Sequence, residues 1–200
     1  MKKLIGINSI IILALIIAGV YYISIYNNIS ENIIRFHVIS NSNSTLDTNI
    51  KLGVRDSVLA SIKGDFTKNS GEQDILSKLP EIELLANEYL KKTNAGYGAK
   101  VVFENTEIPR KEYNGIVLPQ GNYRAIRVIL GEGAGENWWC VAYPPLCFTE
   151  GTFGNMSKEG FDTLKNSLDN ESYRIITSEI NYEFKILEIA EKIAQAIKSH

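Results

Sequence analysis

The hydrophobic pattern begins with one long apolar segment close to the N-terminus. Lys2 and Lys3 precede it, an apolar run extends from Ile10 to Val20, and no charged residue occurs between Lys3 and Glu31. About 20 apolar residues in a helix are enough to span a bilayer. Because basic residues favour the cytoplasmic side of a membrane, the pattern predicts that the chain after Tyr26 is exported.

Two interpretations of this segment remain open, a retained membrane anchor and a cleavable signal peptide. A signal peptide needs small residues at its cleavage site, and here Tyr22 and Ile23 crowd the otherwise suitable Ser24. The anchor is therefore the preferred interpretation. A buried core helix is disfavoured because the segment has no polar face. We expect residues 1–28 to be the anchor or signal peptide and residues 29–200 to form one exported domain.

The exported part opens with a strand, a polar loop and a helix. The segment from Glu31 to Ile39 is rich in β-branched and aromatic residues, which predicts a strand. Ser40–Ser44 is a polar loop with helix-capping side chains. Apolar residues then recur every four positions, which predicts an amphipathic helix from Thr45 to Lys63. These apolar residues are Leu46, Ile50, Val54, Val58 and Ile62.

Two further helices follow from the same periodicity. The first is predicted from Glu72 to Lys92, where Pro80 predicts either two helices or a kink. The second is predicted from Tyr182 to Lys198.

Strands are predicted between these two helices. One begins at Ala99, and others cover Tyr123–Leu130 and Asn137–Tyr143. The glycine-rich segment Gly131–Glu136 joins the last two, so we predict an antiparallel hairpin there. A phosphate loop is disfavoured because such a loop leads into a helix. The predicted fold class is α/β (α+β): a transmembrane or signal helix followed by one domain with a small mixed or antiparallel sheet packed by helices.

Charge narrows the range of partners. The chain has 21 basic and 23 acidic residues; without Lys2 and Lys3 the 21 become 19, so the exported part has a net charge of −4. A nucleic-acid-binding domain usually carries a strong basic excess. We therefore expect no nucleic-acid partner and only a weak electrostatic attraction to anionic lipid.

Residues suited to catalysis or metal binding are sparse. A zinc site would have to use every cysteine and histidine, including the terminal His200. His37 falls in a predicted strand, where a packed or half-exposed histidine is a simpler role than partner to a nucleophilic cysteine. Asp47 and Asp56 are interpreted as helix-surface charges, and Asp56 directly follows Arg55, so those two should not share a face. We expect no catalytic residue, metal, cofactor or small-molecule substrate.

Cys140 and Cys147 flank Pro144 and Pro145, which bend the chain. Export permits a disulfide, and one that closes this short loop would stabilise the fold by roughly 2–3 kcal/mol. The alternative is two buried thiols that pack as small apolar groups. Counting thiols under denaturing, non-reducing conditions distinguishes these possibilities.

Trp138 and Trp139 are adjacent in a predicted strand, so their side chains should point to opposite faces of a sheet. One can fill the core. The other is either covered by a helix or exposed, where a tryptophan is a good interface anchor.

Four segments, taken in order, form a distinctive set. They are Arg35–Ser42, Val54–Leu59, Leu118–Val128 and Gly131–Phe148, the last with its Asn-Trp-Trp-Cys and Pro-Pro-Leu-Cys-Phe runs. Together they resemble the stage II sporulation protein R family of endospore-forming bacteria. The C-terminal region resembles that family only in its helical character.

The resemblance implies a signalling role. Members of this family are made in the forespore and exported into the space between the two sporulation membranes. There they trigger a membrane-embedded aspartic protease of the mother cell, stage II sporulation protein GA, which processes a sigma-factor precursor. The family supplies no established catalytic residues to carry over to this chain.

We therefore expect a non-enzymatic protein ligand whose contact surface combines the Trp138–Phe148 hairpin with the Ser40–Ser44 loop, since loops on a rigid scaffold commonly carry binding residues. The candidate contact residues are Trp138, Trp139, Pro144, Pro145, Asn41 and Ser42. Two alternatives stay open: an extracytoplasmic enzyme that acts on the cell wall, and a structural module of the sporulation envelope.

Overall fold

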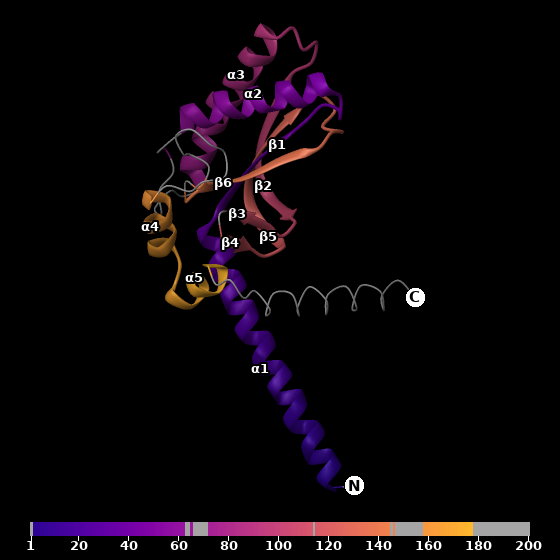
Figure 1. Ribbon diagram of the computed structural model, residues 1–200, viewed down its shortest axis with the longest axis vertical. Coiled ribbons are helices and arrows are strands. Elements are labelled where there is room, and N and C mark those ends of the chain that lie inside the picture. The colour runs from indigo at the N-terminus through magenta and orange to yellow at the C-terminus, as the bar shows by residue number, and fades with distance from the viewer. Residues whose placement is uncertain are drawn as a thin grey trace.

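The computed structural model describes residues 2–62, 65, 72–113, 115–144, 146 and 158–177. The elements in chain order are α1 (Lys2–Asn32), β1 (Ile34–Ile39), α2 (Thr45–Ile62), α3 (Glu72–Lys92), β2 (Ala99–Ile108), β3 (Lys111–Tyr113), β4 (Ile116–Leu118), β5 (Gly121–Leu130), β6 (Asn137–Tyr143), α4 (Lys158–Ser167) and α5 (Asn170–Thr177). The predicted α+β class is confirmed (Figure 1). The helix predicted from Tyr182 to Lys198 lies outside the described residues.

The main sheet is mixed and has the strand order β2-β5-β1-β6. β1 is parallel to β5 and antiparallel to β6, and β5 is antiparallel to β2. β3 and β4 form a separate antiparallel pair that the sequence analysis did not predict, because strands of three residues show no usable periodicity.

The predicted hairpin of β5 and β6 is wrong, because β1 lies between these two strands. Every residue of β1 is buried, so this strand needs a hydrogen-bonded neighbour on each side. Neighbouring strands lie about 4.8 Å apart, so a connection over one strand must cover only about 10 Å. The six residues Gly131–Glu136 are long enough for that crossing.

The sheet separates two hydrophobic cores. α2 and α3 cover one face, where Phe36, Val38 and Ile126 of the sheet meet Val54 and Val58 of α2. On the other face, the end of α1, β4, α4 and α5 form a second core. Its buried apolar residues include Ile25, Ile29, Ile33, Ile116, Leu118, Leu164 and Ile176.

α2 has nearly the predicted bounds, but one residue of its predicted apolar face is wrong. Ile50, Val54, Val58 and Ile62 are buried, whereas Leu46 is 67% exposed. A helix has 3.6 residues per turn, so positions four apart advance about 40° around the axis. Five such positions cannot all face the same core.

α3 is one continuous helix through Pro80, so of the two predicted alternatives, two helices or a kink, the first is wrong. Its inner face is buried at Ile75, Ile82, Ala86 and Leu90, and this packing holds both halves of the helix on the same core.

The first strand starts at Ile34 and not at Glu31, because α1 continues to Asn32. The last turns of α1 are held by burial of Ile25 and Ile29 in the second core. Within the described residues, Ile12–Asn32 is the one stretch long and apolar enough to cross a membrane.

Candidate partner-binding surface

Two loops meet at the carboxyl end of β1. The chain leaves β1 through Ser40–Ser44, while Gly131–Glu136 crosses over the same strand end on its way from β5 to β6. Backbone hydrogen bonds join them: Gly135 N–H donates to the Ser40 carbonyl (2.9 Å) and Ala134 N–H to the Asn41 carbonyl (3.2 Å). The contact between these loops is therefore a consequence of placing β1 between β5 and β6.

Glycine allows this close approach. A Cβ on Gly135 would lie 2.4 Å from the Ser42 carbonyl oxygen, which is a backbone atom and cannot easily move. Gly131 and Gly133 have φ of +54° and +61°, a region that favours glycine. Gly131 and Gly133 thus allow the turn, and Gly135 allows the contact between the loops. Strands β5 and β6 flank the segment, as predicted.

Asp47 holds the first loop in shape. Its carboxylate accepts hydrogen bonds from Ser42 Oγ (2.5 Å), Tyr97 OH (2.5 Å) and Asn41 Nδ2 (2.9 Å). These bonds, led by the one from Ser42, lower the pKa of Asp47 to about 2. Ser44 Oγ caps α2 by accepting the Asp47 N–H (3.1 Å).

The interpretation of Asp47 as a surface charge is wrong, because this residue is only 7% exposed. Its partner Tyr97 is distant in sequence, so no local pattern could reveal the contact. Asp56 does lie at the surface, but its carboxylate accepts a hydrogen bond from Arg55 Nε (2.7 Å). The two residues lie on different faces of the helix, as expected, since Arg55 is buried and Asp56 is half exposed, but the long Arg55 side chain still reaches the neighbouring carboxylate.

Trp138 and Trp139 point to opposite faces of the sheet, as predicted, and both are partly buried. Trp138 meets Phe36 edge to face, and the Arg55 guanidinium lies 4.9 Å from its ring. Trp139 stacks on His37, with ring centroids 4.5 Å apart. β6 is at the edge of the main sheet, and both rings are partly exposed there.

The structure brings the tryptophans and the first loop to one end of the sheet, because Asn137 pairs with Ile39, directly before that loop. Pro144 follows the other end of β6, about 20 Å away at 3.4 Å per residue. Of the five predicted contact residues that the structure describes, Pro144 therefore lies apart from the other four. Pro145 lies outside the described residues.

Cys140 is disulfide-bonded and buried, and its carbonyl accepts a hydrogen bond from Arg35 Nε (3.1 Å). Cys147 lies outside the described residues, so the pairing of these two cysteines stays a prediction.

Two polar residues of β1, Arg35 and His37, are buried beside this edge strand, and only His37 was a candidate from the sequence. Arg35 is fully buried, and its Nη2 donates to Tyr113 OH (2.9 Å). His37 is 2% exposed, and burial, followed by the nearby Arg127 and Arg35, lowers its pKa to about 3. Of its two predicted roles, His37 takes the packed one. No group of three or more metal-ligating side chains occurs among the described residues.

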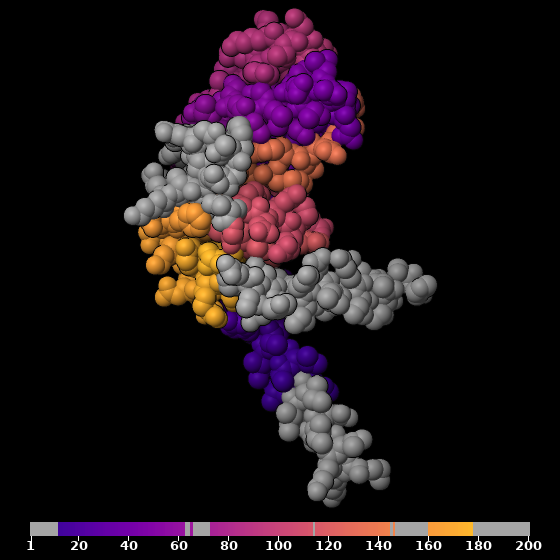
Figure 2. All heavy atoms as spheres, in the orientation of Figure 1, coloured from indigo at the N-terminus to yellow at the C-terminus, as the bar shows by residue number. Residues whose placement is uncertain are grey.

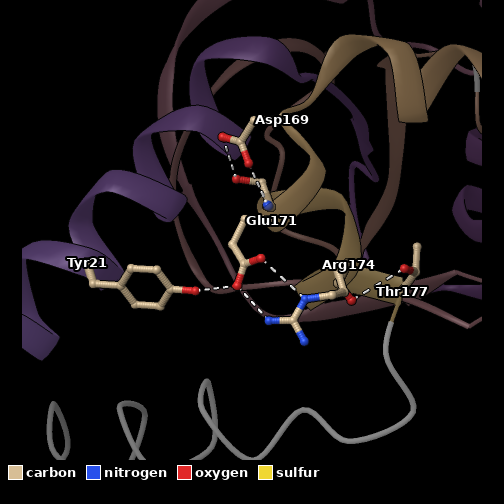
Figure 3. A network of polar contacts seen from close by, with 6 residues as sticks. Tyr21, Asp169, Glu171, Arg174 and Thr177 are labelled. Carbon is tan, nitrogen blue, oxygen red and sulfur yellow. Dashed lines mark hydrogen bonds and ion pairs between the residues drawn. The ribbon is translucent and has the colours of Figure 1, made fainter.

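The end of α1 is fastened to the folded domain by polar contacts (Figure 3). Tyr21 OH donates to Glu171 Oε1 of α5 (2.6 Å), and Arg174 Nη2 donates to the same oxygen (2.6 Å). Tyr26 OH donates to the Asn122 carbonyl (2.7 Å). α1 and the domain are therefore one continuous structural unit.

A family match and a sequence relative both relate this chain to the same family of sporulation proteins. The family described as stage II sporulation protein R matches residues 30–152. The stage II sporulation protein R of Bacillus subtilis (strain 168) is 39% identical over 138 residues, which cover 67% of this chain and 62% of that protein. The match thus spans less than two thirds of that relative. No solved structure matches this chain.

Proposed function

Because the chain belongs to the stage II sporulation protein R family, we propose that it is an exported sporulation signal. In this proposal it crosses the forespore membrane and activates, by contact in the intermembrane space, the membrane-embedded aspartic protease stage II sporulation protein GA. That protease then processes a mother-cell sigma-factor precursor. The family match over residues 30–152 carries the proposal, because it contains all six strands and both loops.

Activation by contact requires a difference in affinity. A ligand that binds the active and inactive arrangements of the protease equally well shifts nothing. To move that equilibrium from 1:99 to 99:1, it must bind the active arrangement about 10⁴-fold more tightly. A rigid binding surface suits this task, and the hydrogen bonds between the two loops and Asp47 provide such rigidity.

The position of the anchor supports the proposed surface. α1 extends from one end of the molecule, and α2 and α3 lie at the opposite end (Figure 1). A chain anchored through α1 would hold the two loops and Trp138 away from its own membrane. That arrangement suits contact with a protein in the facing membrane.

Co-expression in a non-sporulating host tests the proposal. The host would produce this chain, the protease and the sigma-factor precursor, and precursor size would be followed by immunoblot. We expect processing only when this chain is present and the catalytic aspartate of the protease is intact. An uncleaved precursor, with all three proteins present and correctly located, would contradict activation by this chain alone.

Substituting the tryptophans tests the surface. We expect Trp138→Ala or Trp139→Ala to reduce precursor processing at least fivefold at normal protein level, because each removes a large aromatic contact at the sheet edge. Leu84→Ala is the matched control, since Leu84 is an exposed apolar residue on α3. Full processing by both tryptophan variants would show that the contact lies elsewhere.

A further inference from the structure

The sheet face opposite α2 and α3 is only partly covered. At the level of Arg35, its strand neighbours Ala125 and Val141 belong to the second core. Two residues further along β1, on the same face, His37 is flanked by Arg127 on β5 and Trp139 on β6. Both of these side chains are partly exposed. Figure 2 shows the surface indented on one side between the orange region, whose colour includes β6, and the pink region below it.

Polar atoms without partners gather on this face. Among the buried side-chain atoms that the structure describes, Arg35 Nη1, both ring nitrogens of His37 and Arg127 Nε make no hydrogen bond. A buried polar group without a partner typically costs about 1–3 kcal/mol, and a charged one more. Such a cost is tolerated most readily where a ligand supplies the missing partner.

The missing partner is an anion. Arg35 makes no ion pair with a described carboxylate, and its other contacts are the Cys140 carbonyl and two tyrosine rings. Arg127 pairs with Glu104. The two arginines and this one glutamate leave a net charge of +1, within an exported part whose net charge is −4.

We propose that Arg35, His37, Arg127 and Trp139, here called the cationic row, bind one carboxylate from an acidic side chain of the protein partner. The guanidinium groups and the imidazole would donate hydrogen bonds to the two oxygens. The partly exposed Trp139 ring would pack against the apolar part of the same partner segment. The identity of that partner as the protease rests on the function proposed above.

A carboxylate fits better than a phosphate. A carboxylate carries one negative charge, whereas a phosphate dianion would bring two close to Glu104, which pairs with Arg127. Lys111 Nζ lies 5.8 Å from the Trp139 ring, so this side of the site offers a further cation to a neighbouring acidic residue. The proposed occupant is therefore an acidic protein segment, and the second test below distinguishes it from a lipid headgroup, whose phosphodiester also carries one negative charge.

The first test uses the full chain in the co-expression assay. His37→Phe keeps an aromatic ring against Trp139 but removes both nitrogens, so we expect an equal or higher melting temperature with at least fivefold less processing. Arg127→Gln removes the net positive charge and should cause a similar loss. Lys78→Gln, which removes a paired cation on α3, is the matched control and should process normally.

A charge-balanced double variant separates recognition from structure. Arg127→Gln together with Glu104→Gln restores the net charge of +1 through Arg35, so we expect it to recover at least half of the processing lost in Arg127→Gln. A merely structural role for the ion pair predicts that the double variant is no better than the single one. That result, or full processing by both His37→Phe and Arg127→Gln, would overturn the proposal.

The second test needs no protease, so it separates failure of this inference from failure of the proposed function. Trp138→Phe in the full chain leaves Trp139 as the sole tryptophan, whose fluorescence reports on the cationic row. We expect a saturable change with N-acetyl-glutamate amide that His37→Phe abolishes. A change only with inorganic phosphate or with anionic phosphatidylglycerol vesicles, or no change with any probe, would contradict carboxylate binding.

Discussion

Asp47 joins residues that lie far apart in the chain. Ser42 and Asn41 precede it closely, but Tyr97 reaches it from the turn after α3. The same side chain therefore fixes the first loop and attaches it to α3. At the scale of single residues, this carboxylate is the most connected point of the proposed surface.

The pH dependence of stability tests this role. The pKa of Asp47 falls from 3.8 to about 2 on folding, so the unfolded chain takes up the proton first as pH falls. The stabilisation, about 2 kcal/mol, is complete above pH about 4 and is lost as pH falls towards 2. We expect Asp47→Asn to lose about this amount at pH 7, measured by urea unfolding of the full chain in detergent micelles.

Asp56→Asn is the matched control, because Asp56 lies on the same helix with a half-exposed carboxylate paired to Arg55. The Asp56 carboxylate is half exposed, and the Arg55 guanidinium keeps its contact with the Trp138 ring, so this variant should cost less than Asp47→Asn. Equal losses of unfolding free energy in both variants would show that the Asp47 hydrogen bonds stabilise the fold no more than the Asp56 ion pair does.

At the scale of elements, the order of strands creates the candidate surface. β1 pairs in parallel with β5 and antiparallel with β6, so the connection between those two strands must cross its end. The crossing brings Gly131–Glu136 against Ser40–Ser44, and Lys51 of α2 donates to the Glu136 carbonyl (2.9 Å). A simple hairpin would have left the two loops apart.

Pro80 offers a test of how packing overrides local preference. It lies exposed inside α3, where it lacks the N–H that would donate to the carbonyl four residues earlier. Proline is about 3 kcal/mol less favourable than alanine in a helix interior, and its stiffening of the unfolded chain offsets up to about 1 kcal/mol.

We therefore expect Pro80→Ala to stabilise the fold by about 1–3 kcal/mol and to raise the melting temperature, followed by circular dichroism. Leu84→Ala, one turn further along α3, is the control and should leave the melting temperature nearly unchanged. A decrease for Pro80→Ala would mean that α3 depends on the proline geometry.

At the scale of the whole molecule, α1 belongs to two environments. Ile12 to Ile17 are exposed to the surroundings apart from the domain, whereas Ile25, Ile29 and Ile33 are fully packed in the second core. A domain boundary at residue 28 would therefore cut through one continuous helix. The candidate membrane span and the second core share that helix, which fixes the orientation of the span relative to the domain.

Truncation tests this continuity. A chain that starts at Tyr21 keeps every core contact of α1 and should fold, whereas one that starts at Ile34 loses three buried isoleucines and should not. Near-ultraviolet circular dichroism and resistance to protease would distinguish the two. Equal folding of both fragments would contradict a structural role for α1.

Point variants in the full chain provide the matched comparison. Ile29→Ala should cost about 2–5 kcal/mol, because it leaves a cavity in the second core. Ile16→Ala, at a position 57% exposed, should leave the stability of the domain unchanged.

The sequence by itself determined the apolar N-terminal helix, the bounds of α2 and α3, the positions of β5 and β6, and the family. These features depend on local periodicity and on runs of particular residues, which adjacent positions reveal. Only the tertiary structure decided that β1 lies between β5 and β6, that Asp47 and Arg35 are buried, and that α1 enters the core. Each of these depends on pairing between segments far apart in the chain, and free energy from such contacts leaves no local pattern.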